Sequence, residues 1–385
     1  MRAVCQDADA EPPPAAFGTP RSSRDVHDRD QVRYTLDHGF FRRVRRRLVR
    51  AFVITGPGAA EVQDVAPPRP RPGEVVVDVA RAGVCGTDVE FFTGEMSYLH
   101  TGQARYPIRI GHEWSGTVSA LGDGVDPSWL GRRVTGDTML GCGRCARCLS
   151  GRQHVCADRY EIGVRNGWPG ALAEQLPVPA RALQALPDDL DVALGALVEP
   201  GGNALRAVLG AGLRPGERLL VMGPGTIGLL AAKIGAAHGA EVHLLGRDRA
   251  TLDFAASIGF EHVWTRDTLP GLPYDAVLDA SNAAALPALA VELVEPGRRV
   301  VYIGIAGQPS LLDTRELALK DVTAVGVLSA SGGLAGTVEL YASGAVDPRP
   351  LVAATVGLDE VAGVLAGRRR PEWGAAPKIQ VDPRR

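Results

Sequence analysis

Lysine is nearly absent from this 385-residue chain, whose 42 basic residues include only Lys233, Lys320 and Lys378 besides the arginines. The 44 acidic residues leave a net charge of −2. A chain so close to neutrality has no electrostatic reason to bind nucleic acid or an anionic membrane. We therefore expect neither as a partner.

Long hydrophobic runs are also missing. No apolar stretch reaches the roughly 18 residues that a membrane-spanning helix requires, and the N-terminus lacks the short apolar core of a secretory signal. We expect a cytoplasmic protein whose cysteines stay reduced. With 45% apolar residues, the chain is long enough for two domains that each have a core.

Residues 1–48 lack the hydrophobic periodicity of a helix or strand. They contain PPP at 12–14, a charge-mixed segment and the basic run RRVRRR at 42–47. A disordered extension is favoured over an arm that binds nucleic acid or a membrane. A further hypothesis is that Val49 is the true initiator, read as Met from a GTG codon, and that residues 1–48 are absent from the native protein.

The remaining chain changes its rhythm near residue 200. Segments such as EVVVDVARAGV at 74–84 and SGTVSAL at 115–121 are typical of strands, separated by Gly, Asp and Pro. From about 201 to 330, strand and helix patterns alternate, which predicts an α/β fold with a doubly wound parallel sheet. We expect a β-rich domain over 49–200 to which residues 331–385 return.

The segment GPGTIG follows a buried strand pattern and opens a helix pattern. It places Gly223, Gly225 and Gly228 in G-x-G-x-x-G spacing around Thr226 and Ile227. Glycines there permit a tight turn, close approach of backbone N–H groups to a pyrophosphate, and close packing of helix on strand. This context predicts a dinucleotide site.

The end of the next strand pattern indicates which dinucleotide binds. A carboxylate there would bridge the ribose hydroxyls of NAD, but this chain has Gly246 and Arg247, followed by Asp248 and Arg249. A guanidinium pairs well with a 2′-phosphate. Asp248 is either a displaced ribose ligand or, as we favour, the N-cap of the following helix. We therefore expect NADP(H), with NAD(H) as the alternative.

Four of the six cysteines lie within fifteen residues. Cys142, Cys145, Cys148 and Cys156 follow the spacing C-x2-C-x2-C-x7-C. A reducing compartment argues against disulfides, and a ferredoxin run would have x3 before a fourth cysteine that Pro follows. The spacing therefore predicts a closed, structural zinc site in a lobe at 141–157.

A second set of potential ligands is dispersed along the chain. GVCGTD contains Cys85, IGHEWSG contains His112 and Glu113, and LVEPGG contains Glu199. Taken singly, each has an ordinary structural explanation. Together they supply a thiolate, an imidazole and one or two carboxylates, which is the composition of an open catalytic zinc site.

From about residue 50 onward, the chain resembles a zinc-containing medium-chain dehydrogenase/reductase of the alcohol dehydrogenase superfamily. GVCGTD, GHEWSGTV, the four-cysteine segment, VEP and GPGTIG occur in the family's order and at its intervals. Within the family the chain is similar to the polyol, sugar, threonine and aminocyclitol dehydrogenase branch. The resemblance implies a GroES-like catalytic domain, a homodimer or homotetramer, and a zinc held by Cys85, His112 and Glu113, with Glu199 as a further ligand or one water away.

The resemblance also implies roles near the zinc. Thr87 is placed to hydrogen-bond the substrate oxygen, and Asp88 to accept the second N–H of His112. Alcohol dehydrogenases continue the proton path with a histidine three residues beyond the threonine, where this chain has Glu90. In the loop 91–107, Phe92, Tyr98 and His100 either touch substrate or are ordinary loop packing.

The expected function is hydride transfer between NADP(H) and a secondary alcohol or ketone of a sugar, polyol or aminocyclitol. The alternatives are an NAD-dependent polyol or amino-alcohol dehydrogenase and, with the same fold, a zinc-free quinone or enone reductase. We expect a catalytic zinc that exchanges more readily than the structural one. The strand pattern VTAVGVLSA at 322–330 could extend a sheet across a dimer.

Overall fold

The computed structural model describes residues 48–385, and the hypotheses for residues 1–47 lie outside this range. The first described element is a hairpin of β1 (Val49–Gly56) and β2 (Ala59–Val65). The strand pattern expected from Val49 onward therefore begins at that residue.

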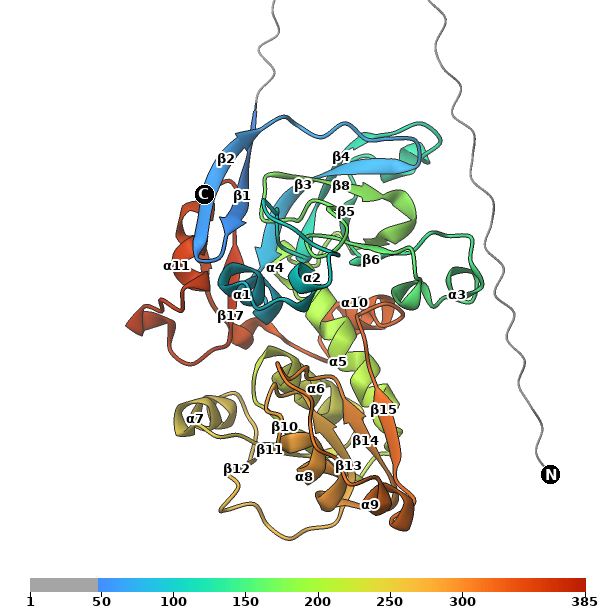
Figure 1. Ribbon diagram of the computed structural model, residues 1–385, viewed down its shortest axis with the longest axis vertical. Helices are drawn as coiled ribbons and strands as arrows, with labels where there is room; N and C mark the ends of the chain where they lie inside the picture. The colour runs from blue at the N-terminus through green and yellow to red at the C-terminus, as the bar shows by residue number, and fades with distance from the viewer. Residues whose placement is uncertain (1–47) are drawn as a thin grey trace, which may run out of the picture. The chain divides into compact units, whose positions relative to one another are not determined.

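The half that contains the GPGTIG segment is a six-stranded parallel sheet, coloured yellow to orange in Figure 1. Its strands are β10 (Arg218–Met222), β11 (Glu241–Leu245), β12 (His262–Trp264), β13 (Tyr274–Asp279), β14 (Val294–Tyr302) and β15 (Thr323–Gly326). Their spatial order is β12-β11-β10-β13-β14-β15. The order reverses between β10 and β13, which is where a doubly wound sheet opens a crevice for a ligand.

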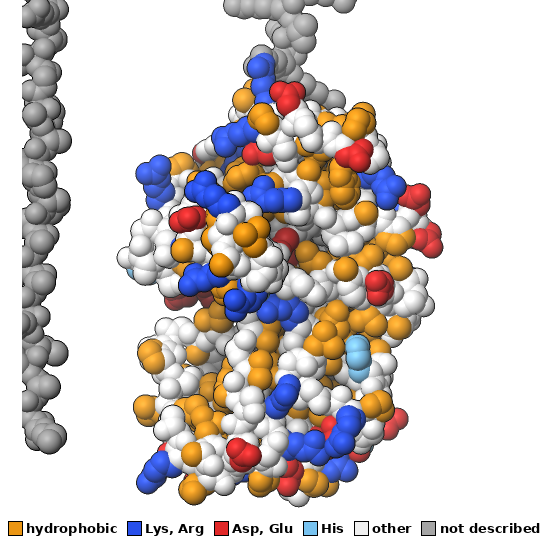
Figure 2. Space-filling model, turned by 90° about the vertical axis from the view of Figure 1, so that its right-hand side faces the viewer, with side chains coloured by type: hydrophobic (Ala, Val, Ile, Leu, Met, Phe, Trp, Pro, Cys, Tyr) orange, Lys and Arg blue, Asp and Glu red, His pale blue; other side chains and the backbone are white. Residues whose placement is uncertain are grey.

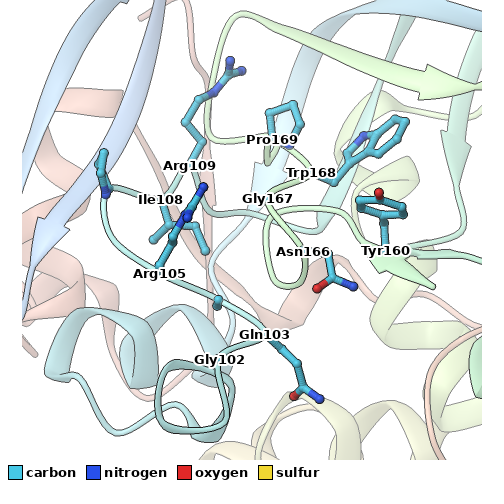
Figure 3. Close-up of a pocket in the computed structure, with 12 residues that line it drawn as sticks. Gly102, Gln103, Arg105, Ile108, Arg109, Tyr160, Asn166, Gly167, Trp168 and Pro169 are labelled. Atoms are coloured by element: carbon cyan, nitrogen blue, oxygen red, sulfur yellow. The ribbon is translucent and has the colours of Figure 1, made fainter. Parts of the chain in front are cut away.

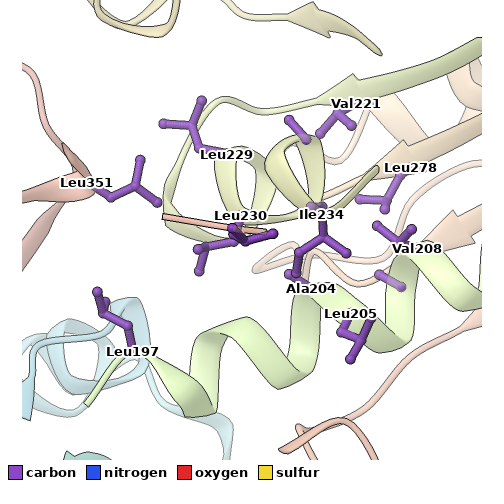
Figure 4. Packing of buried hydrophobic residues seen from close by; sticks show 14 of the residues in the cluster. Leu197, Ala204, Leu205, Val208, Val221, Leu229, Leu230, Ile234, Leu278 and Leu351 are labelled. Carbon is purple, nitrogen blue, oxygen red and sulfur yellow. The ribbon is translucent and has the colours of Figure 1, made fainter. Parts of the chain in front are cut away.

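Helices cover both faces of this sheet because side chains alternate along each strand. They are α5 (Val198–Ala211), α6 (Thr226–Ala237), α7 (Arg249–Ser257), α8 (Leu286–Leu293) and α9 (Thr314–Leu319). Leu219 and Val221 of β10 pack in the core formed with α5 and α6, whereas Leu220 and Met222 pack in the core on the α8 side. Figure 4 shows the first core, where Leu230 and Ile234 of α6 face α5.

The β-rich half contains a seven-stranded sheet. Its strands are β3 (Glu74–Gly83), β4 (Glu113–Leu121), β5 (Arg133–Gly136), β8 (Gln175–Pro179), β9 (Leu183–Ala185), β16 (Val352–Val356) and β17 (Lys378–Val381). The order is β16-β17-β3-β4-β5-β9, and β8 also pairs with β3. The last strand of the chain therefore lies beside the first long strand, with Gln380 opposite Gly83.

Short elements complete this half. The remaining strand pair is β6 (Met139–Leu140) and β7 (Tyr160–Glu161), and the helices are α1 (Gly86–Thr93), α2 (Ser97–His100), α3 (Ala146–Leu149), α4 (Val192–Gly195), α10 (Leu334–Ala342) and α11 (Val361–Leu365). Single 3₁₀ turns occupy Pro127–Trp129, Gln153–Val155, Ala180–Ala182, Arg349–Leu351, Leu358–Glu360 and Pro371–Trp373.

Helix α5 joins the two halves and crosses the expected boundary at residue 200. It contacts β4 and β5 of one sheet and β13 and β14 of the other. Near its start, the buried Tyr341 hydroxyl donates a hydrogen bond to Leu197 O at 3.2 Å. On the face shown in Figure 2, basic and acidic side chains lie interspersed with hydrophobic ones.

Candidate active site

Three of the expected zinc ligands meet where β3 and β4 pair. Cys85 is the N-cap of α1, two residues after β3 ends, while His112 and Glu113 stand at the start of β4. The antiparallel register sets Gly83 opposite Glu113. One ligand atom from each of Cys85, His112 and Glu113 lies within 4.8 Å of the others, so the three can share one metal ion.

Lys378 is a site residue that sequence reasoning did not find. Its Nζ lies 2.7 Å from both carboxylate oxygens of Glu113 and also donates to Val84 O at 2.9 Å. Both side chains of the pair are buried, and Glu113 holds the pKa of Lys378 above its usual value although burial opposes the charge. The sequence did hold a signal for it: Lys378 is one of only three lysines, and it lies in an apolar strand pattern near the C-terminus.

Gly83 makes room for this carboxylate. A Cβ at position 83 would lie 1.9 Å from Glu113 Oε2, so no side chain fits there. The absent side chain lets the buried Glu113–Lys378 pair lie directly against β3.

Glu199 lies outside the group of three ligands. It is the second residue of α5 and is buried, and its Oε1 accepts a hydrogen bond from Asn203 Nδ2 at 2.9 Å. Burial and the neighbouring Glu113 charge raise the pKa of Glu199 to about 7. This carboxyl can therefore hold a proton near neutral pH.

Asp88 lies beneath the cluster but does not make the expected bond to His112. Its Oδ1 is 3.9 Å from His112 Nδ1, which has no hydrogen-bond partner. The carboxylate instead accepts from the backbone N–H groups of Cys85 at 2.9 Å and Gly111 at 3.2 Å. These bonds fix the ligand-bearing backbone, and burial raises the pKa of Asp88.

The negative groups around His112 decide its charge. Burial opposes an imidazolium, but the adjacent Cys85, Asp88 and Glu199 together hold the pKa of His112 well above its ordinary value. Without a metal, the cluster therefore favours a cation at this position. A divalent ion would supply that positive charge while His112 binds it as a neutral imidazole.

The candidate residues that follow Cys85 differ in their burial and in their contacts. Thr87 is half-buried at the second position of α1, and burial raises the pKa of the half-buried Glu90. Phe92 is buried in the core of the β-rich half, and His100 is exposed with Nε2 3.0 Å from Gly94 O. The Tyr98 hydroxyl donates to Glu161 Oε1 at 3.2 Å.

The four clustered cysteines form a separate group. Cys142 Sγ lies 3.9 Å from Cys148 Sγ, and Cys145 Sγ lies 3.8 Å from Cys156 Sγ. These are not disulfide distances, and zinc–sulfur bonds of about 2.3 Å at tetrahedral angles set sulfur atoms about 3.8 Å apart. Backbone N–H groups of Arg144 and Cys145 lower the pKa of Cys142 to about 6, which favours the thiolate that a metal needs.

Glu241, His243 and His262 form a third group with metal-ligand atoms in reach of one another. Trp264 Nε1 can only donate, and it lies 3.0 Å from His243 Nδ1. The proton of His243 is therefore on Nε2, which donates to Glu241 Oε1 at 2.9 Å. Both ring nitrogens are in use, and we assign this histidine a structural role.

The glycine motif borders a cavity of about 910 Å³. Gly223 adopts φ +96°, and a Cβ on Gly228 would lie 1.9 Å from Gly223 O. Thr226 and Ile227 begin α6 directly behind this turn. The glycines therefore serve the tight turn and the close helix packing that their spacing predicted.

Arg247 and Asp248 line the same cavity, together with Thr251, Arg266 and Arg369, which sequence reasoning did not identify. Asp248 occupies the N-cap position of α7 as expected, but its side chain accepts no helix N–H. It lies 3.4 Å from Arg247 instead. Arg249 pairs with Asp253 at 3.2 Å, one turn along α7.

Two domain models describe most of this architecture. An alcohol dehydrogenase GroES-like domain matches residues 71–188, and a zinc-binding dehydrogenase domain matches residues 226–343. With the Rossmann-type sheet and the two cysteine-containing clusters, these matches confirm the predicted fold class. The chain belongs to the zinc-containing medium-chain dehydrogenase/reductase family and is an enzyme of its alcohol and polyol dehydrogenase group.

Named relatives lie in the branch that the sequence resembled. A 2-dehydro-3-deoxy-L-galactonate 5-dehydrogenase of Pseudoalteromonas atlantica is 30% identical over 307 residues, which cover 77% of this chain and 88% of the relative. An L-threonine 3-dehydrogenase of Idiomarina loihiensis is 30% identical, over 69% of this chain and 79% of the relative.

A solved structure shares the fold of this chain. A zinc-binding dehydrogenase of Sinorhizobium meliloti 1021, bound to NADP, superposes with a TM-score of 0.79 at 26% identity. The match covers 87% of this chain and 99% of that one. In the described part of this chain, no helix has the length and hydropathy of a membrane span.

Proposed function

We propose that this enzyme transfers hydride between NADP(H) and a secondary alcohol or ketone of a sugar, polyol or aminocyclitol, with the help of zinc. The observation that carries the proposal is the group of half-buried Cys85 with buried His112 and Glu113, in a chain whose nucleotide cavity has Arg247 and Arg266 in its lining. The structure of the relative bound to NADP supports the cofactor.

The donor sets fit two zinc ions. Cys85, His112 and Glu113 would hold a catalytic ion, and Cys142, Cys145, Cys148 and Cys156 a structural one. A catalytic zinc supplies Lewis acidity toward the substrate oxygen, and the nicotinamide exchanges hydride. About two zinc ions per chain support this proposal, whereas none, or only the structural ion, would support a zinc-free enone reductase.

The protein's own groups would position this chemistry and move its proton. Lys378 holds Glu113 through both oxygens and neutralises it, which leaves one negative charge fewer around the metal. Thr87 Oγ1 is the group we assign to hydrogen-bond the substrate oxygen. The buried carboxyl of Glu199 is the group we assign to accept the proton.

Cofactor choice rests on the cavity lining at the end of β11. Arg247 and Arg266 offer guanidinium groups for a 2′-phosphate, and Thr251 offers a hydroxyl. Asp248 is exposed and lies against Arg247, in keeping with a carboxylate that serves its neighbour rather than a ribose.

Fluorescence titration with NADPH and NADH tests this assignment. We expect tighter binding of NADPH, and Arg247→Met should weaken NADPH binding about tenfold or more while leaving NADH binding unchanged. Arg249→Met is the matched control, because Arg249 pairs with Asp253 instead of lining the cavity. Tighter NADH binding would make Asp248 a ribose ligand and favour the NAD-dependent polyol or amino-alcohol dehydrogenase.

A polar network close to the zinc ligands supports a hydroxylated substrate. Tyr98 and Arg159 hydrogen-bond to each other at 3.2 Å and both contact Glu161. The residue directly after β7 connects to the site, since Ile162 N donates to Thr138 O and Thr138 Oγ1 donates to His112 O. Ranking kcat/KM for polyols with NADP⁺ and for keto-sugars with NADPH tests the class, and preference for a simple apolar alcohol contradicts it.

We also propose a homodimer formed at the free edge of β15. In the described chain, β15 pairs only with β14, and the preceding segment exposes Leu311 and Leu319 by 92% and 81%. Light scattering should give a dimer or tetramer that Leu319→Lys weakens, and a monomeric parent chain refutes the assignment.

We propose the reducing cytoplasm as the compartment of this protein, because cysteine metal ligands must stay reduced.

A further inference from the structure

A second cavity, of about 590 Å³, opens in the β-rich half of the molecule. Residues from the segments 102–109 and 160–169 line it, and it shares no residue with the nucleotide cavity or with the group of Cys85, His112 and Glu113. The two lining segments are fixed to each other, because Asn166 N donates to Gln103 O at 2.8 Å and Gly170 N donates to Arg109 O at 3.0 Å. Backbone hydrogen bonds therefore fix the two segments that line the cavity relative to each other.

One side of this cavity is aromatic. Trp168 Nε1 donates to Pro177 O at 3.0 Å, which fixes the indole. The ring of Tyr160 meets it edge-on with centroids 5.8 Å apart, and Tyr160 remains 44% exposed. Figure 3 shows Trp168, Pro169 and Tyr160 on the side opposite Arg105 and Arg109. The cavity thus presents a fixed apolar wall.

The opposite side is cationic. Arg109 Nη2 donates to Gln175 O at 3.2 Å, but its Nε is buried without a hydrogen-bond partner. Burial lowers the pKa of Arg109, and no carboxylate of the described residues counters this. Arg105 is exposed on the same side. A partly desolvated guanidinium without a counter-charge is costly, and a bound oxyanion would remove that cost.

We propose that this cavity binds a monosaccharide phosphate at a site separate from the catalytic zinc and the nucleotide. The guanidinium groups of Arg105 and Arg109 supply positive charge and N–H donors for the phosphate oxygens. The flat C–H face of a sugar ring packs on the aromatic wall, and the amides of Gln103 and Asn166 both donate to and accept from hydroxyls. A volume of about 590 Å³ lies within the range of small-molecule sites.

Calorimetric titration of the full chain with D-glucose 6-phosphate tests the proposal. Arg105→Met and Arg109→Met should each weaken binding about tenfold, because each removes a charge-assisted contact. Arg132→Met is the matched control, since this exposed arginine lies outside the cavity and should leave the affinity unchanged. Arg105 is exposed, so its variant keeps the test informative even where Arg109→Met fails to fold.

Two further titrations separate the sugar from the anion. Tyr160→Ala should weaken binding of D-glucose 6-phosphate several-fold but leave binding of inorganic phosphate unchanged, because only the sugar uses the aromatic wall. D-glucose alone should bind more weakly than its phosphate. The inference is overturned if inorganic phosphate or AMP binds as tightly as D-glucose 6-phosphate, or if 10 mM ligand gives no heat.

The location of binding is tested with a variant of the catalytic site. Cys85→Ser should retain D-glucose 6-phosphate binding, since Cys85 does not line this cavity. Loss of binding in Cys85→Ser together with retention in Arg105→Met would place the ligand at the catalytic site and refute the second site. This readout is heat of binding, so it remains valid whatever reaction the enzyme catalyses.

Discussion

The two cysteine-containing clusters of this protein are built in opposite ways. The lobe cluster draws all four ligands from residues 142–156, and three of its four cysteines are half-buried. The other cluster takes Cys85, His112 and Glu113 from the paired ends of β3 and β4 and relies on Lys378 from the last strand. The first follows from local spacing, and the second exists only once a sheet has formed.

The difference extends to electrostatics. In the lobe, backbone N–H groups stabilise the Cys142 thiolate within a short loop. In the sheet cluster, a carboxylate and an ammonium are buried together, and His112, Glu199 and Asp88 lie in the same buried surroundings. The lobe is thus suited to hold one ion permanently, whereas the sheet cluster holds charges that a reaction can use.

The largest expected effect separates the clusters by function. Cys85→Ala should lower kcat at least about 10³-fold with a small change in Tm, because loss of a Lewis acid removes several kcal/mol of transition-state stabilisation. Cys148→Ser should lower zinc content and Tm but leave substantial kcat in the folded fraction. Steady-state kinetics, metal analysis and thermal melts check both variants, and the reverse pattern would exchange the roles of the two sites.

The second effect concerns the buried ion pair. In the protein after zinc removal, Lys378→Met leaves the Glu113 carboxylate buried without a cationic partner and should cost about 3–5 kcal/mol of unfolding free energy. Adding Glu113→Gln should recover part of that loss, because the uncompensated charge is then gone. Urea unfolding of the parent, the two single variants and the double variant measures the coupling. Additive losses would show that Lys378 acts independently of Glu113.

The third effect is a pH dependence of the metal-free protein. Because Glu199 has a folded pKa of about 7, the folded chain keeps a proton there between pH of about 4.5 and 7 that the unfolded chain has released. The parent should therefore lose about 2–3 kcal/mol relative to Glu199→Gln as pH rises through this window, with no further change above it. Urea unfolding after zinc removal measures the difference. A constant difference across the window would show an ordinary carboxyl at position 199.

The smallest effect is kinetic. A chelator should remove the zinc of the sheet cluster before that of the four-thiolate lobe, because a catalytic ion keeps an open coordination position that a closed tetrathiolate site lacks. Activity should fall with loss of the first ion while the second is retained. Zinc release and residual activity followed in the same sample decide the order, and earlier release from the lobe would show that burial protects the sheet cluster.

Motifs with local causes were predictable from the sequence. Gly223, Gly225 and Gly228 mark a turn whose close contacts require glycine, and the spacing of Cys142, Cys145, Cys148 and Cys156 sets the size of the loop that brings them together. The return of the chain's end to the first domain was expected, but the contact of Lys378 with Glu113 that results from it was not. The hydrogen bond expected between Asp88 and His112 also fails, because backbone N–H groups of Cys85 and Gly111 occupy the carboxylate.

The sequence alone determined the fold class, the glycine turn, the four-cysteine lobe and the residue types of the proposed catalytic site, because each depends on chemistry or spacing within a short stretch. Only the tertiary structure decided that Lys378 holds Glu113, that Arg266 joins Arg247 in one cavity, and that Arg105 and Arg109 line another with Tyr160 and Trp168. Those contacts depend on which strand ends and loops become neighbours. Strand order and register decide which segments become neighbours, and the spacing of residues within a short stretch does not specify either of them.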